Sequence, residues 1–142
     1  MTFIHKWADL KEGVIVGDNT IIGGFVTIEK DAVIGNNVTI QPYSIISSYA
    51  VIESNVFIGP HFSCANVKYI PDGTHGQAVN KKPGKEEIMV IGQGTRIGTR
   101  CTVGPGVHIG KNCFIKMNCV IYDNVPDNTT VYANTRWELD YG

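Results

Sequence analysis

Residues 14–64 read VIVGDNTIIGGFVTIEKDAVIGNNVTIQPYSIISSYAVIESNVFIGPHFSC, and an aliphatic residue or a cysteine recurs in them at every sixth position. A second series with the same spacing runs from Ile91 to Ile121. A period of six is neither the period of about 3.6 of an α-helix nor the alternation of a simple strand, so the repeat itself must be interpreted. The two series are Val16, Ile22, Ile28, Ile34, Ile40, Ile46, Ile52, Ile58 and Cys64, then Ile91, Ile97, Val103, Ile109, Ile115 and Ile121.

The residues between these positions are mostly Gly, Asn, Asp or small residues, as in IGNNVT and IGKNCF. Gly and Asn tolerate the left-handed backbone that a sharp corner requires, so short strands separated by tight corners are expected. Three such units would close a triangular coil of 18 residues. Residues 18 apart are alike, which favours a parallel β-helix: Gly24, Pro42 and Pro60 form one line, and Asn19, Asn37 and Asn55 form another.

In this pattern the chain resembles the hexapeptide-repeat acyltransferases, whose fold is the left-handed parallel β-helix. The resemblance implies the left hand, since crossovers between parallel strands are otherwise right-handed. The expected fold class is therefore all-β, as one domain over residues 1–142 with coils at about 4–66 and 88–125. An inserted loop is expected at about 67–87, and a C-terminal tail at 126–142.

Cys64 and Ile91 are 27 positions apart, which is not a multiple of six, so the segment between them must leave the coil. Its prolines, glycines and lysines are typical of a long loop, and a long loop on a rigid scaffold is often functional. At the N-terminal end, Trp7 is expected to help close the first coil, because an uncapped repeat stack exposes its core.

The composition favours a soluble protein with neither a nucleic-acid nor a membrane partner. The formal net charge is −1, no run of 18 apolar residues occurs, and the start MTFIHKWADL lacks the apolar core of a signal peptide. A cytoplasmic location is the default expectation. All four cysteines fall on inward positions and no C-x-x-C spacing occurs, so they are interpreted as core residues and no metal site is predicted.

Ile15, Val33 and Val51 are spaced by 18 and fall on the outer face of the expected coil. An apolar line across three coils indicates a contact surface. The family forms trimers with active sites between neighbouring subunits, so the resemblance implies a homotrimer.

Phe25, Tyr43 and His61 form another line, at one corner just before the loop. Two interpretations stay open. The rings pack on one another along the corner, or they form a wall for a base or a sugar, since aromatic faces bind planar and apolar groups. Phe25 and Tyr43 are therefore candidate substrate-binding residues, and His61 is either a candidate base or one ring of the stack.

Within the family, the resemblance is closest to the N-acetyltransferases of nucleotide-linked amino sugars. It rests on residues 4–28, on residues 40–66, which end in VFIGPHFSCAN, and on NVPDNTTVYANTR at residues 124–136. In those enzymes an asparagine at the place of Asn66 contacts the amino group to be acetylated. An amide oxygen at that place can orient an amine by a hydrogen bond without taking its proton.

Sugar O-acetyltransferases of this fold place a histidine where this chain has Tyr69, counted from the turn at Gly59 and Pro60. A neutral amine attacks a thioester without the activation that a hydroxyl needs, so the missing histidine favours an amine acceptor. Tyr69 is then a candidate for substrate contact, and His75 in the loop is a candidate base.

The resemblance also implies acetyl-CoA as the co-substrate, with its pantetheine arm between two coils near the C-terminal turns. Gly104 and Gly106 would allow a close approach, and Lys111, Lys116 and Arg136 would meet the phosphates. These five residues are the candidate cofactor-binding residues.

Together these observations predict an acetyltransferase that uses acetyl-CoA to N-acetylate a dTDP- or UDP-linked amino sugar in surface polysaccharide biosynthesis. A sugar O-acetyltransferase and a non-catalytic β-helix scaffold remain as alternatives. A zinc hydratase of the same fold would need three converging histidines. The four histidines, His5, His61, His75 and His108, include no closely spaced pair.

Overall fold

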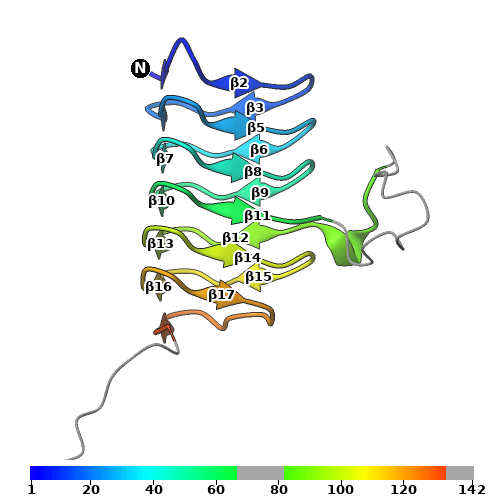
Figure 1. The fold of residues 1–142 in the computed structure, drawn as a ribbon, viewed down its shortest axis with the longest axis vertical. Coiled ribbons are helices and arrows are strands. Elements are labelled where there is room, and N and C mark those ends of the chain that lie inside the picture. The colour runs from blue at the N-terminus through cyan, green and yellow to red at the C-terminus, as the bar shows by residue number, and fades with distance from the viewer. Residues whose placement is uncertain (67–81, 134–142) are drawn as a thin grey trace, which may run out of the picture.

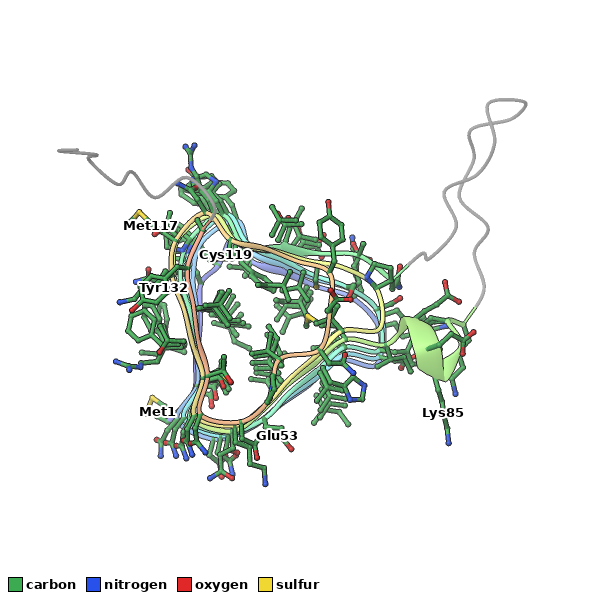
Figure 2. All side chains as sticks on the ribbon, turned by 90° about the horizontal axis from the view of Figure 1, so that it is seen from below. Met1, Glu53, Lys85, Met117, Cys119 and Tyr132 are labelled. Carbon is green, nitrogen blue, oxygen red and sulfur yellow. The ribbon has the colours of Figure 1, made fainter. Side chains whose placement is uncertain are left out.

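The computed structural model describes residues 1–66 and 82–133, which wind into a solenoid of stacked coils (Figure 1) with a triangular cross-section (Figure 2). The strands are two residues long and form three parallel sheets, one on each side of the triangle. Sheet A contains β1 (Phe3–Ile4), β4 (Ile21–Ile22), β7 (Thr39–Ile40), β10 (Phe57–Ile58), β13 (Arg96–Ile97), β16 (Phe114–Ile115) and β18 (Thr130–Val131). Sheet B contains β2 (Asp9–Leu10), β5 (Thr27–Ile28), β8 (Ile45–Ile46), β11 (Ser63–Cys64), β14 (Thr102–Val103) and β17 (Val120–Ile121). Sheet C contains β3 (Ile15–Val16), β6 (Val33–Ile34), β9 (Val51–Ile52), β12 (Val90–Ile91) and β15 (His108–Ile109).

The one helix in the described residues is η1 (Lys85–Glu87), a single 3₁₀ turn that stands outside the coil before β12. No described helix is therefore long and apolar enough to cross a membrane. Almost all of the regular structure is strand, as the period of six predicts.

The hand of the coil follows from the view along its axis from the C-terminal end (Figure 2). In that view the side that starts near Met1 leads to the corner near Cys119, then to Lys85, and back past Glu53. This path is clockwise while the chain advances toward the viewer, and such a coil is left-handed. The predicted fold class, an all-β left-handed parallel β-helix, is confirmed.

The repeated aliphatic residues point inward and form the core. Strands pair in register with the next coil, so that Ile28 lies opposite Ile46, and like side chains stack along the axis. The buried hydroxyls of Thr20, Ser44 and Thr95 donate to backbone carbonyls, as Thr95 Oγ1 does to Gly110 O at 2.7 Å. In the described residues no buried side-chain nitrogen or oxygen lacks a partner. Side chains of the series that are at most 1 % exposed are Ile22, Ile28, Ile34, Ile40, Ile46, Ile52, Ile58, Ile91, Ile97, Val103, Ile109 and Ile115.

At most of the described corners a residue with positive φ stands three positions before an inward residue of the next strand. Asn37 and Asn55 have φ of 55° and 62°, at the corner between sheets C and A. This backbone costs most residues about 1–2 kcal/mol, and asparagine adopts it more readily than other side chains. The Asn37 N–H donates to Asp18 O at 2.9 Å, so each corner is also joined to the coil before it. These requirements explain the line of asparagines.

The helix continues into the segment that the sequence assigns to the tail. β18 pairs with β16, with Thr130 opposite Phe114, an offset of 16 rather than 18. Val125 fills the inward position on the third side and bridges to Ile109, although it follows Ile121 by only four residues. The last described coil is two residues shorter than the others, and this hides it from a fixed count of six.

The expectation that Trp7 closes the first coil is wrong. Trp7 stacks on Phe25 at the outside of a corner, with ring centroids 5.4 Å apart, and is 57 % exposed. The inward Ile4 in the same coil remains 44 % exposed. Trp7 occupies the corner position, 18 residues before Phe25, and that position points away from the core.

Candidate functional site

Two corners flank β11, and the candidate residues divide between them. At the A–B corner, where sheet A leads into sheet B, the rings of Trp7, Phe25, Tyr43 and His61 form one continuous column. Their centroids are 5.4, 5.3 and 5.2 Å apart, and the two later pairs are within 9° of parallel. The column is the predicted aromatic line, lengthened by Trp7.

This stacking limits what the column can bind. Phe25 and Tyr43 each have a ring on both faces, so a base or a sugar can reach only their edges. Both residues have positive φ, 58° and 65°, which is costly for a bulky side chain. A stacked pair contributes about 0.5–1.5 kcal/mol and offsets much of that cost. Substrate binding by Phe25 and Tyr43 stays a prediction, now restricted to ring edges.

The B–C corner, where sheet B leads into sheet C, holds Asn66. Asn66 is half-buried and follows β11 at the place where the long segment leaves the coil. Its Nδ2 donates a hydrogen bond to the hydroxyl oxygen of Ser48, the residue one coil earlier. The Asn66 amide is therefore held by the coil itself.

Cys64 distorts the ladder beside this asparagine. Its Sγ accepts the Ser47 N–H at 3.1 Å and donates to Ser47 Oγ at 3.2 Å. In the preceding coil the corresponding N–H, of Glu29, bonds to the carbonyl of Ile46 at 2.9 Å. The thiol thus takes the place of a backbone carbonyl, and β8 and β11 pair in register at Ser63 and Ile45 but not at the next position. The distortion coincides with the exit of the chain from the coil.

Tyr49 and its neighbours meet the chain where it returns. The ammonium nitrogen of Lys82 lies 5.3 Å from the centre of the Tyr49 ring. A hydrogen bond with the Asp31 carboxylate raises the pKa of the Tyr49 hydroxyl. Asp31, Tyr49 and Lys82 therefore form a charged and aromatic surface next to the Ser48–Asn66 pair.

η1 covers the B–C corner of the coil that contains Gly106. Gly106 has φ of 73°, and a side chain there would begin 1.8 Å from the carbonyl oxygen of Glu86. The return of the chain into the coil therefore requires a glycine at this position. The predicted contacts of Gly104 and Gly106 with the cofactor stay predictions. At Gly104 a side chain would only touch the Ile121 carbonyl, at 3.4 Å.

His61 and Asn66, the two predicted catalytic residues that the structure describes, do not meet within one copy of the chain. His61 precedes β11 and Asn66 follows it, so five steps of nearly extended chain separate them, about 16 Å at about 3.3 Å per residue. Tyr69 and His75 lie outside the described residues. Of the two described candidates, Asn66 lies at the B–C corner, as the last described residue before segment 67–81.

The predicted phosphate-binding lysines also lie apart. Lys111 precedes β16 and is exposed, whereas Lys116 follows it, with Nζ 4.0 Å from the centre of the Phe114 ring. The Arg96 guanidinium lies over the same ring at 4.3 Å. Arg136 lies outside the described residues. Their role in cofactor binding stays a prediction.

The cysteines behave as core residues in the described structure. Burial raises the pKa of the Cys64, Cys101 and Cys119 thiols, which keeps them neutral and weakly nucleophilic. Cys101 Sγ donates to Lys116 O at 3.1 Å. Among residues 1–66 and 82–133 no group of three His, Cys, Asp or Glu could hold a metal ion.

These pKa shifts predict that stability falls in alkaline solution. A group whose pKa is higher in the folded chain stabilises it below the group's ordinary pKa, 9.0 for a thiol, and this contribution is lost as the pH rises through the folded value. Tyr49 and Lys11 shift in the same direction. We expect the urea midpoint to fall between about pH 8 and pH 10, less steeply in Cys101→Val. A midpoint that rises with pH would contradict the upward shifts.

Sequence reasoning missed Ser48, Tyr49 and Asp31. A signal for all three was present, since Ser48 lies 18 residues before Asn66 and Asp31 lies 18 before Tyr49. Comparing residues 18 positions apart, as was done for the prolines and asparagines, would have placed Ser48 beside Asn66 and Asp31 beside Tyr49.

Six-residue repeats, two-residue strands and three parallel sheets define a left-handed hexapeptide solenoid. The model of one family, described as bacterial transferase hexapeptide (six repeats), matches residues 31–61 and 89–123. Over these residues the predicted resemblance to the hexapeptide-repeat transferases is confirmed.

Several solved structures share the fold. A variant of perosamine N-acetyltransferase from Caulobacter crescentus, in complex with CoA and GDP-perosamine, is 20 % identical with a TM-score of 0.74, over 91 % of this chain and 51 % of that one. The acetyltransferase domain of PglB from Neisseria gonorrhoeae is 18 % identical with a TM-score of 0.77, over 98 % and 58 %. A UDP-N-acetylglucosamine acyltransferase from Francisella novicida is 26 % identical with a TM-score of 0.74, over 90 % and 47 %. The chain thus spans about half the length of these proteins.

Proposed function

We propose that this chain is an acetyltransferase that uses acetyl-CoA to acetylate the amino group of a nucleotide-linked amino sugar. It would act as a cytoplasmic enzyme of surface polysaccharide biosynthesis. One observation carries the proposal: Asn66 is half-buried, is hydrogen-bonded to the coil, and stands where the long segment departs. The likeness to an N-acetyltransferase that was solved with CoA and GDP-perosamine supports it.

Acetyl transfer to a neutral amine requires the protein mainly to position the two reactants. The nitrogen lone pair of the amine attacks the thioester carbonyl carbon, a C–N bond forms, and the C–S bond breaks. CoA leaves as the thiolate, and the proton that the nitrogen loses neutralises it. The Asn66 amide oxygen accepts an N–H of the amine and orients the lone pair, but it cannot take the proton.

The two alternatives differ in what they require. An O-acetyltransferase needs a base beside the hydroxyl, and the three described histidines lie away from Asn66 in one copy of the chain: His5 and His61 at the A–B corner, and His108 on the outer face of sheet C. A scaffold without catalytic activity needs no acetyl-CoA. Acetyl-CoA should therefore raise the melting temperature of an enzyme and leave that of a scaffold unchanged, because a ligand of the native state stabilises it.

Release of the CoA thiol tests the proposal. The chain is incubated with acetyl-CoA and dTDP-, UDP- or GDP-linked amino sugars, with the matching hydroxyl sugars as controls. We expect thiol release with at least one amino sugar and none above background with its hydroxyl counterpart. Release with the hydroxyl sugars alone would replace this proposal by the O-acetyltransferase.

We also propose that the chain forms a homotrimer through the outer face of sheet C. Ile15, Val33 and Val51 stack in register there, Ile15 and Val33 are 60 % and 38 % exposed, and Val90 continues the line in the next coil. Such a continuous apolar stripe is costly to leave in water.

Sedimentation tests this assembly. The wild-type chain should sediment as three copies of 15.5 kDa. Val33→Glu should dissociate the trimer, because it places a charge in the apolar stripe. Thr39→Glu, on the outer face of sheet A, is the matched control and should not. A wild-type monomer at micromolar concentration would refute the trimer.

A further inference from the structure

Ser48 holds the Asn66 amide by its nitrogen end. Nδ2 of Asn66 donates to Ser48 Oγ, one coil away. A primary amide has donors on its nitrogen and an acceptor on its oxygen, so binding Nδ2 leaves Oδ1 to meet a ligand. In the described residues no group donates to Oδ1.

We propose that Ser48 is a positioning residue: it holds the Asn66 amide with Oδ1 toward the acceptor, so that the site takes a hydrogen-bond donor, an amino group, at this point. The inference rests on the proposed function, because it assigns the reason for which that site prefers an amine. An amide without this bond would also adopt the flipped orientation, in which its NH₂ group would face the N–H bonds of an amine.

The coil is rigid where Ser48 stands. Ser48 follows Ile46, which is fully buried, and its neighbour Ser47 is bonded to Cys64 through both N–H and hydroxyl. On the other side the Tyr49 N–H donates to Lys30 O at 3.0 Å. The hydroxyl that receives Asn66 is thus held on a packed strand end, and its position does not depend on the residues that follow Asn66.

The side-chain amide signals of Asn66 test the hydrogen bond without any substrate. In ¹⁵N-correlated NMR spectra this NH₂ pair is identified by its absence in Asn66→Asp. Ser48→Ala should move the pair and speed its exchange with water. Ser54→Ala is the matched control, since Ser54 Oγ accepts the Asn36 N–H at 3.0 Å at another corner and should leave the pair unchanged. An unchanged pair in Ser48→Ala would overturn the inference.

Steady-state kinetics test whether the Ser48–Asn66 bond affects catalysis. Ser48→Ala should lower kcat/KM for the amino sugar about 2- to 10-fold, the factor expected for one neutral hydrogen bond. Ser48→Thr should restore most of it, and Ser54→Ala should not change it. In an Asn66→Asp background Ser48→Ala should have little effect, because a carboxylate presents two equivalent oxygens.

The outcomes separate the two proposals. Equal losses from Ser48→Ala in the wild-type and Asn66→Asp backgrounds would show that Ser48 does not act through Asn66, which overturns the inference. If the wild-type chain acetylates no amine at all, the proposed function fails, and the NMR spectra alone then decide whether Ser48 holds the amide.

Discussion

Replacing Asn66 by Ala should lower the turnover of amino-sugar acetylation by about 10- to 1000-fold, the range expected when positioning and polar stabilisation of the reacting group are lost. The melting temperature should change little, because Asn66 lies at the edge of the coil and is only half-buried. Steady-state thiol release with the amino sugar measures the effect. A variant that keeps full turnover would remove Asn66 from the mechanism.

His61→Asn and His75→Ala are the controls for this experiment. His61 stacks on Tyr43, with ring centroids 5.2 Å apart, at the other end of β11 from Asn66. Each variant should therefore keep more activity than Asn66→Ala. The pH–rate profile should rise with the ionisation of the substrate's own amine and persist in both. Loss of activity in either histidine variant, with activity kept in Asn66→Ala, would instead indicate a histidine base.

Ile46→Asp should abolish soluble expression. The Ile46 side chain is fully buried in the column of isoleucines, and an aspartate there would bury an unpaired carboxylate at a cost of several kcal/mol, or be forced to stay protonated. Ile45→Asp is the matched control on the same strand, because Ile45 points outward and is 47 % exposed. The soluble fraction and the circular dichroism of the two variants measure the difference. Equal solubility would contradict the inward register.

The fold could be predicted from the sequence because one requirement repeats in every coil. Each inward position needs an aliphatic side chain, and each corner needs a residue that tolerates positive φ. Ile22 and Asn19 satisfy both requirements, and residues 18 apart repeat them. Where the requirement is met with a different spacing, as in the step from Ile121 to Val125, a fixed period no longer shows it.

The candidate site was less predictable because its residues act through space and not through the repeat. The approach of Glu86 to Gly106 depends on where the inserted segment returns, which no period in the sequence specifies. The stacking of Phe25 on Tyr43 was one of two open interpretations, and only ring orientations show that their faces are covered. Asn66 could be named from a resemblance, whereas its bond to Ser48 required coordinates.

The most direct measurement is the position of the acetyl group on the product. The chain is incubated with [¹³C]acetyl-CoA and a nucleotide-linked amino sugar that also carries free hydroxyls, and the product is examined by NMR. An amine acceptor oriented by Asn66 predicts the labelled carbonyl bonded to nitrogen, as an amide. A labelled ester on a sugar hydroxyl, or no transfer to any dTDP-, UDP- or GDP-linked amino sugar, would contradict it.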